Sequence, residues 1–178
     1  MKILISDKMS NKVEDVLRSK SIDYDIKTGL EPNELKTIID DYDGILIRSA
    51  TKLTSDILEN CSNLKVIGRA GVGVDNVDLD VATKNKILVM NTPLGNLEAT
   101  AELTVGLMFS LYRHIHNANA STHEGKWEKA KFMGTELKGK TLGIVGFGNI
   151  GQRVAEICKA IGMQILTNSN SASDEVLN

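Results

Sequence analysis

The chain has 178 residues, of which 42% are hydrophobic and 25% charged, with a formal net charge of -2 and two cysteines. This composition is typical of a soluble globular protein, and the small net charge gives no support for binding to nucleic acid or to anionic membranes. No apolar run has the length of a transmembrane helix, and Met1-Lys2 leads directly into a strand rather than a signal peptide. Cys61 and Cys158 lie far apart without metal-ligand spacing, so we expect reduced, buried thiols, a cytoplasmic location and no metal site.

The first 90 or so residues alternate between short apolar strands and short helices. Strands are predicted at 2–6, 21–26, 45–47, 64–68 and 87–90. Helices are predicted between them, at 11–19, after Glu31-Pro32, at 53–59 with Thr54 as N-cap, and at 78–84. Strands that alternate with helices predict a parallel sheet covered on both faces.

The pattern changes after Asn91-Thr92-Pro93 to one helical stretch, 97–119. At about 20 residues it is much longer than the usual helix of about 11. Its apolar stripe consists of Leu103, Leu107, Met108, Leu111 and Ile115. A helix of this length without an intervening strand is a candidate for a connection between two domains or for a subunit contact.

The stretch 141–162 is the most informative part of the chain. An apolar run ends at Gly146-Phe147-Gly148-Asn149-Ile150-Gly151, and apolar residues at helical spacing follow, which predicts a strand, a glycine turn and a helix. Gly146 permits a sharp turn, Gly148 lets a pyrophosphate approach the backbone, and Gly151 lets the helix lie close to the strand. The N–H groups of the first helical turn would then face the anion. The motif favours dinucleotide binding over the alternative, a glycine turn in an ordinary α/β unit.

A second strand, 164–167, follows this helix, and after it the nucleotide-binding pattern is broken. A ribose-binding acid should stand about 20 residues past the glycines, but the chain reads Asn168-Ser169-Asn170 there. Asn168 or Ser169 could donate a weaker hydrogen bond, so selectivity for an unphosphorylated ribose is not supported. Only strand, helix and strand follow residue 140, which indicates an incomplete nucleotide-binding domain, and we expect the polar tail 168–178 to be disordered.

Two loops that follow predicted strands are suited to anions. Arg48 directly follows a buried strand, where an arginine can bind a carboxylate or phosphate with two hydrogen bonds. Arg69 opens a second loop, in which Gly71 and Gly73 expose backbone N–H groups that could hold a small carboxylate. The alternatives are a solvated arginine and a plain turn before a helix. The segment 91–96 could be a hinge that faces a cofactor or, equally, a simple turn.

These stretches together resemble the D-isomer-specific 2-hydroxy-acid dehydrogenases and, within that family, the branch that acts on 3-phosphoglycerate. The matching segments are RSATKLT at 48–54, RAGVGVDNVD at 69–78, ILVMNTPLGN at 87–96, AELTVGLM at 101–108 and GKWEKAKFMGTELKGKTLGIVGFGNIG at 125–151. The last segment is far more specific than the glycine motif alone, and the resemblance extends to about residue 167.

The resemblance implies an α/β protein with a flavodoxin-like parallel-sheet substrate domain at 1–96, followed from 97 to 178 by an incomplete Rossmann nucleotide-binding domain that uses NAD. The long helix would be the crossover and part of a dimer contact. Anionic groups of the substrate would be bound by Arg48, Arg69, the backbone of Gly71, Val72 and Gly73, and, at the neighbouring subunit's substrate, Lys129. The cofactor would be bound by Val72 near the nicotinamide, by Gly146, Gly148, Asn149, Ile150 and Gly151 at the pyrophosphate, and by Ser169 in place of the family's ribose-binding aspartate.

The resemblance also implies chemistry for which this chain holds no residues. The family uses an arginine that orients the substrate and a histidine–glutamate pair, in which the histidine takes the hydroxyl proton while hydride leaves for the nicotinamide. His114, His116 and His123 do not match that histidine's position, so no catalytic residue is assigned. We therefore expect an inactive N-terminal portion of an NAD-dependent enzyme of serine synthesis. The alternatives are a non-catalytic partner of a full-length subunit and a fragment specific for another 2-hydroxy acid.

Overall fold

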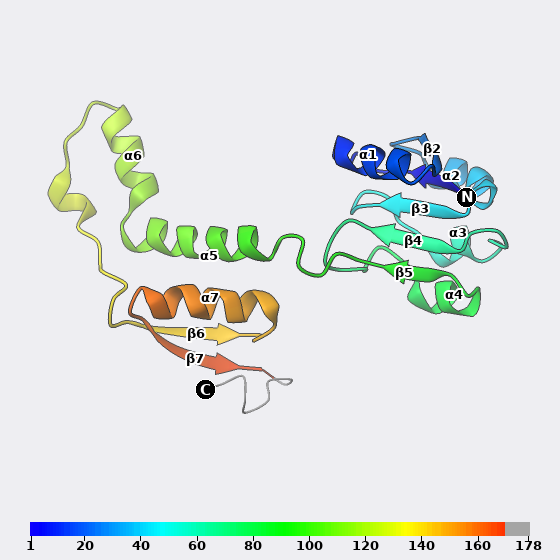
Figure 1. The fold of residues 1–178 in the computed structure, drawn as a ribbon. Coiled ribbons are helices and arrows are strands. Elements are labelled where there is room, and N and C mark those ends of the chain that lie inside the picture. The colour runs from blue at the N-terminus through cyan, green and yellow to red at the C-terminus, as the bar shows by residue number, and fades with distance from the viewer. Residues whose placement is uncertain (170–178) are drawn as a thin grey trace. The chain divides into compact units, whose positions relative to one another are not determined.

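The structure, a computed structural model, describes residues 1–169 and shows two compact units, Met1–Gly95 and a second that begins at Asn96 (Figure 1). Each unit has its own hydrophobic core. Of the tail that we expected to be disordered, 170–178 lie outside the described residues. Asn168, by contrast, belongs to a strand, so that expectation was wrong at the start of the tail.

The first unit is built on a five-stranded parallel sheet in the order β2-β1-β3-β4-β5 (Figure 1). Its strands are β1 (Lys2–Ile5), β2 (Asp23–Ile26), β3 (Gly44–Ile47), β4 (Val66–Arg69) and β5 (Leu88–Met90). The register pairs Ile47 with Arg69, the last residues of β3 and β4. The loops that follow these two strands therefore leave the same edge of the sheet side by side.

Short helices connect the strands of this sheet. They are α1 (Asn11–Ser19), α2 (Pro32–Ile38) with the 3-10 turn η1 (Ile39–Asp41), α3 (Ser55–Leu58) and α4 (Leu79–Lys84). Asp78 caps α4 by accepting a hydrogen bond from the Val81 N–H at 3.0 Å. Thr54 stands at the N-cap of α3 as expected, but its side chain makes no capping hydrogen bond.

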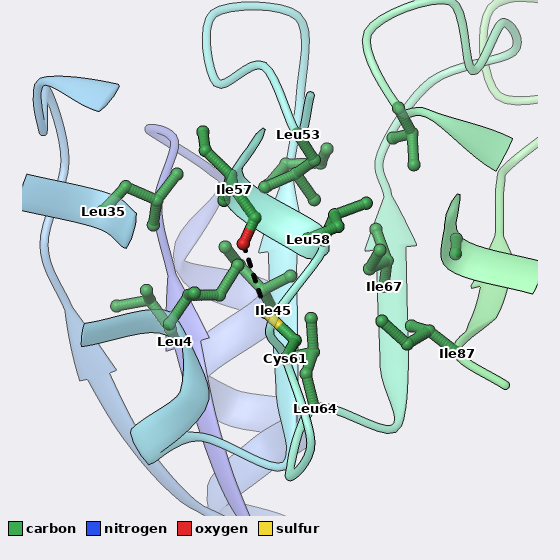
Figure 2. Packing of buried hydrophobic residues seen from close by; sticks show 14 of the residues in the cluster. Leu4, Leu35, Ile45, Leu53, Ile57, Leu58, Cys61, Leu64, Ile67 and Ile87 are labelled. Atoms are coloured by element: carbon green, nitrogen blue, oxygen red, sulfur yellow. Dashed lines mark hydrogen bonds between the residues drawn. The ribbon is translucent and has the colours of Figure 1, made fainter. Parts of the chain in front are cut away.

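The helices α2, α3 and α4 cover one face of the sheet and form the main core of the unit. Figure 2 shows side chains of the strands and helices packed together, among them Leu4, Leu35, Ile45, Ile57, Leu58 and Ile67. Cys61 lies in this core, and its Sγ–H donates to the Ile57 carbonyl at 3.3 Å. Because each fully buried aliphatic side chain contributes about 1.5–3 kcal/mol, this cluster is the principal source of the unit's stability.

Within residues 1–169, the opposite face of the sheet is covered only in part, by α1. Leu17 packs against Ile3 and Ile5 there, but Leu88 and Met90 of β5 are 59% and 50% exposed. Our expectation of a sheet covered on both faces was therefore wrong at the β5 edge. A helix about 10 Å wide covers only about two strands spaced about 4.8 Å apart, so one helix cannot cover the whole face.

The second unit consists of helices packed on a two-stranded parallel sheet. It contains α5 (Leu97–Tyr112), α6 (Ile115–His123), the 3-10 turn η2 (Lys129–Phe132), β6 (Thr141–Val145), α7 (Asn149–Ala160) and β7 (Gln164–Asn168). Its core includes Ala101 and Val105 from α5 and Val154 and Cys158 from α7. Within residues 1–169, no helix is both long enough and apolar enough to cross a membrane.

The single helix expected over 97–119 is in fact two helices. The chain turns at His114, which has a left-handed backbone conformation with φ of +53°. The Tyr112 carbonyl accepts a hydrogen bond from the Thr135 N–H at 2.9 Å. In a continuing helix, the same carbonyl would accept from the N–H of residue 116 instead. A Cβ atom on Gly134 would overlap the Tyr112 carbonyl oxygen, so only glycine allows the returning chain to come this close and end α5.

Most of the apolar stripe predicted for this stretch does not pack against α7. Leu103, Leu107 and Leu111 are 63%, 60% and 73% exposed, and only Met108 of the predicted stripe joins the core of the unit. The side of α5 that faces α7 carries Ala101 and Val105 instead. The helix α5 therefore has two apolar sides, one of which is exposed.

Candidate functional site

The glycine turn between β6 and α7 has the backbone geometry that a pyrophosphate requires. Gly146 has φ of +93°, a conformation that favours glycine. A Cβ atom on Gly151 would overlap the Gly146 carbonyl oxygen, so α7 can approach the strand only because this residue is glycine. At Gly148, a Cβ atom would meet no atom within 4 Å, which leaves open space beside the backbone.

The first turn of α7 presents its backbone donors at this open space. The Gln152 N–H donates to the carbonyl of Gly148, the N-cap residue, at 2.9 Å. The N–H groups of Asn149, Ile150 and Gly151 precede the first hydrogen bond of the helix, so they have no acceptor within it, and they lie at the positive end of the helix dipole. Asn149 is exposed and Ile150 is half-buried in the core of the unit. The residues present therefore fit a dinucleotide pyrophosphate, since an anion here would meet N–H groups rather than side chains.

Ser169 lies directly after β7, whose last residue Asn168 is paired with Val145 at the end of β6. The Gly146 N–H donates to the Asn168 carbonyl at 2.8 Å, which ties the glycine turn to the end of β7. Ser169 is thus held next to the glycine turn, as a ribose-contacting residue would need to be.

At the sheet edge of the first unit, a buried carboxylate holds the loop that carries Arg48. Asp7 is 6% exposed and accepts the Arg48 N–H at 2.6 Å and the Thr51 hydroxyl at 2.8 Å. The Arg48 side chain is exposed, and its Nη1 donates to the Lys8 carbonyl at 3.4 Å. The backbone of the loop is therefore fixed while the guanidinium group stays accessible.

Arg69 is held differently, with only 12% of its side chain exposed. Its Nε donates to Asn76 Oδ1 at 3.0 Å, and its Nη2 lies 3.9 Å from Asp75 Oδ1. A Cβ atom on Gly71 would overlap Nη1 of Arg69, so the missing side chain of Gly71 makes room for the guanidinium group. The sequence suggested instead that Gly71 served only to expose its backbone.

The glycine loop after β4 has fewer available donors than its sequence suggests. The Gly71 N–H donates to the Arg69 carbonyl at 2.9 Å, so among the three residues proposed to hold a carboxylate, only Val72 and Gly73 keep N–H groups without a partner in residues 1–169. The Val72 carbonyl accepts Nδ2 of Asn91 at 2.6 Å, and the Gly71 carbonyl accepts the Thr92 N–H at 3.0 Å. These bonds tie the loop to the segment after β5.

An open pocket of about 550 Å³ lies beside these loops, and its lining includes Ser49, Lys52, Asp75 and Asn76. The structure thus places the loops of Arg48 and Arg69 at one edge, although the two guanidinium groups have different partners. Sequence reasoning missed Asp7 and Asn76, which organise these loops. Asn76 lies inside the quoted RAGVGVDNVD segment, but spacing alone does not distinguish it from its neighbours.

Lys129, the remaining residue of the predicted set, lies in the second unit at the start of η2 and is exposed. The neighbouring basic residues have partners, since Lys126 pairs with Glu124 at 2.7 Å and Lys131 with Glu128 at 3.4 Å. Lys129 makes no ion pair within residues 1–169. Its charge is therefore available to a ligand or to another chain.

Neither cysteine is suited to nucleophilic chemistry. Both are free and buried. Burial, with a smaller contribution from Asp40, raises the pKa of Cys61 to about 11, and burial also raises the pKa of Cys158. Among residues 1–169, no cluster of three or more histidine, cysteine, aspartate or glutamate side chains could hold a metal ion.

Comparison with known proteins agrees with this arrangement. Residues 3–177 match the D-isomer specific 2-hydroxyacid dehydrogenase catalytic domain. A protein named D-3-phosphoglycerate dehydrogenase from Archaeoglobus fulgidus is 43% identical over 98% of this chain, and one from a Synechocystis strain is 47% identical over 98%. The chain spans about a third of these relatives, 33% and 31% of their lengths.

A solved structure shows the same fold. It is the cofactor (NAD+)-bound 3-phosphoglycerate dehydrogenase of Entamoeba histolytica, with a TM-score of 0.77 and 32% identity, over 99% of this chain and 56% of that one. The resemblance and the parallel-sheet α/β class predicted from the sequence are therefore confirmed.

Proposed function

Because the chain belongs to the D-isomer specific 2-hydroxyacid dehydrogenase family, we propose that its residues contribute coenzyme and substrate binding to an enzyme for the NAD-dependent oxidation of 3-phosphoglycerate to 3-phosphohydroxypyruvate in serine biosynthesis. The single observation that carries the proposal is the glycine turn before α7, where Gly146, Gly148 and Gly151 together clear a space for an anion at a helix N-terminus. Bound NAD would supply the acceptor for the substrate hydride. The residues of this chain would bind and orient the two molecules.

The first unit supplies groups that suit a substrate with two anionic ends. The guanidinium groups of Arg48 and Arg69 and the N–H groups of Val72 and Gly73 are donors for a carboxylate and a phosphate. Lys129 would add a charge for the phosphate of a substrate bound to a neighbouring subunit. Together, these donors and positive charges favour a phosphorylated 2-hydroxy acid over an unphosphorylated one.

The coenzyme site can be tested with the Gly148→Val variant. A Cβ atom at Gly148 meets no protein atom within 4 Å, so the variant should fold, but its side chain would fill the space that the pyrophosphate needs. We expect NADH binding, measured by calorimetry, to be lost. The control is Gly143→Val, because a Cβ atom at Gly143 on β6 also meets nothing within 4 Å. Equal NADH affinity in the two variants would argue against the site.

The same titration with NADPH tests the role of Ser169. A serine hydroxyl is neutral, whereas the carboxylate found at this position in NAD-selective sites repels a 2′-phosphate. We expect NADPH and NADH affinities within about tenfold of each other, which is about 1.4 kcal/mol. A preference for NADH of a hundredfold or more would contradict this assignment.

We expect the purified 178-residue chain to be catalytically inactive. The arginine, glutamate and histidine that the family resemblance implies have no matching positions in this sequence, so the expected acceptor of the hydroxyl proton is missing. The measurement is NADH formation from 3-phosphoglycerate and NAD, followed by absorbance. Turnover above that of a Gly148→Val control would refute the expectation.

A second candidate function is that of a non-catalytic partner of a full-length subunit, or of a second copy of this chain. The exposed leucines of α5, Leu103 and Leu107, favour it, because isolated proteins rarely leave such an apolar side open. Light scattering after size-exclusion chromatography should then show a dimer that the Leu103→Lys/Leu107→Lys variant loses. Leu94→Lys, at a comparably exposed leucine of the first unit, is the control.

A further inference from the structure

The side chain of Asn76 joins the two arginine-bearing loops. Its Nδ2 donates to the carbonyls of Arg48 and Thr51 at 2.7 and 2.6 Å, and its Oδ1 accepts Nε of Arg69 at 3.0 Å. Asn76 lies seven residues beyond Arg69 on the same loop. One half-buried amide thus contacts the backbone that follows β3 and the guanidinium group of the last residue of β4.

These bonds, with those of Asp7, fix the loop after β3 from two directions. Asp7 accepts the N–H groups of Arg48 and Thr51 at 2.6 and 3.2 Å, and Asn76 donates to the carbonyls of the same two residues. Because the N–H and carbonyl groups of both Arg48 and Thr51 are hydrogen-bonded, the loop loses little further conformational freedom when a ligand binds. Pre-ordering of this kind improves affinity without adding contacts to the ligand.

Asn76 also determines how the Arg69 guanidinium group is oriented. A bond to Nε fixes the plane of the group, because the other two nitrogens lie in the same plane. The alternative partner, Asp75, is 3.9 Å away and 86% exposed, so it is a poor substitute. Without Asn76, the guanidinium group could rotate in the space that Gly71 leaves open.

We propose that Asn76 is a positioning residue for the substrate: it holds the Arg48 loop and the Arg69 guanidinium group in the relative arrangement that binds one phosphorylated 2-hydroxy acid. This inference rests on the proposed function. An amide is required because it has two donors and an acceptor on one short side chain. Aspartate would lack the donors for the Arg48 and Thr51 carbonyls, and its charge would neutralise the guanidinium group that should meet the substrate.

The test is the affinity of the full chain for 3-phosphoglycerate, measured by calorimetry on Asn76→Ala and Asn76→Asp. We expect each variant to raise Kd about tenfold or more, because the Arg69 guanidinium group is no longer held in position to donate to the substrate. The matched control is Asn85→Ala. Asn85 is also half-buried and its Nδ2 also donates to two backbone carbonyls, those of Leu58 and Glu59 at 2.6 and 3.3 Å, but it lies away from both arginines.

A merely structural role would weaken folding in Asn76→Ala and Asn85→Ala alike and leave Kd unchanged. An unchanged Kd in Asn76→Ala would therefore overturn the inference, but it would leave the proposed function intact. Failure of the unmodified chain to bind 3-phosphoglycerate would overturn the proposed function and, with it, the inference. A second readout is the Nε–H signal of Arg69 in nuclear magnetic resonance spectra. It should be slow to exchange in the unmodified chain and in Asn85→Ala and lost in Asn76→Ala, and its persistence in that variant would also count against the inference.

Discussion

Gly71 and Gly151 are both crowded positions, but different atoms occupy the space that a side chain would take. At Gly151 the neighbour is the backbone carbonyl of Gly146, and at Gly71 it is the guanidinium group of Arg69. The carbonyl oxygen of Gly146 cannot move without displacing the backbone of the glycine turn, whereas an arginine side chain can adopt another rotamer. The two glycines thus have different tolerance to substitution. The sequence predicted the close approach of the helix at Gly151, but not the guanidinium group at Gly71.

The first prediction concerns this backbone contact. We expect Gly151→Ala to lower the free energy of unfolding of the second unit by about 1–3 kcal/mol, since the added methyl must push α7 away from β6. Gly143→Ala, where the methyl meets open space, should change it by no more than about 0.5 kcal/mol. Urea denaturation measures both variants. Equal stability of the two would mean that α7 can shift without cost.

The second prediction concerns the thiols. The reactive species is the thiolate, and burial, together with Asp40, raises the pKa of Cys61 to about 11. At about pH 8, well below that pKa, almost all of the Cys61 thiol is neutral. Burial also raises the pKa of the Cys158 thiol. We expect both to react slowly with a disulfide reagent in the native protein and rapidly in urea. Fast modification of the native chain would show that one of the cores opens readily.

At the scale of the secondary-structure elements, the break between α5 and α6 is decided by a contact distant in sequence. Thr135 donates to the Tyr112 carbonyl, and His114 takes a left-handed conformation between the two helices. The stretch 97–119 contains no proline, and its one glycine, Gly106, lies inside α5 and not at the break, which is why periodicity predicted one helix. The helix α5 is therefore ended by the returning segment at Gly134 and Thr135, and not by a residue of its own sequence.

The third prediction follows from the conformation of His114. A non-glycine residue in the left-handed region costs about 1–2 kcal/mol, so His114→Gly should stabilise the second unit by about 0.5–1 kcal/mol after the added freedom of the unfolded chain is counted. His116→Gly, inside α6, should destabilise it by a few tenths of a kcal/mol. Urea unfolding followed by circular dichroism distinguishes the two. A loss of stability in His114→Gly would show that the turn is held by the imidazole rather than by the backbone.

For the molecule as a whole, the two units are stabilised by separate cores. The cluster around Leu4, Ile45 and Ile67 lies within the first unit, and the cluster around Val105 and Cys158 lies within the second. The proposed substrate groups Arg48 and Arg69 belong to the first unit and the pyrophosphate turn to the second.

The fourth prediction is that residues 1–95 fold when produced alone. Their five-stranded sheet and largest buried cluster contain no residue from beyond Gly95. We expect a single cooperative urea transition and dispersed amide signals in nuclear magnetic resonance spectra. A peptide without secondary structure at 25 °C would show that the first unit depends on the rest of the chain.

Several features could be predicted because they depend on neighbours in the sequence. The strands of the first unit were predicted from apolar runs, and the glycine turn from the spacing of Gly146, Gly148 and Gly151. Other features could not be predicted. The exposed side of α5 contains leucines, and no local pattern says which of two apolar sides a helix will bury.

The amino-acid sequence by itself determined the α/β class, the family and the glycine turn, because strand and helix periods and glycine spacing are local properties that survive without a folded context. Only the tertiary structure decided that Asn76 and Asp7 hold the Arg48 loop, that Gly71 accommodates a guanidinium group and that α5 ends at Tyr112. Each of these depends on a hydrogen bond or a close approach between separate segments of the chain. Such contacts exist only once packing has brought the segments together.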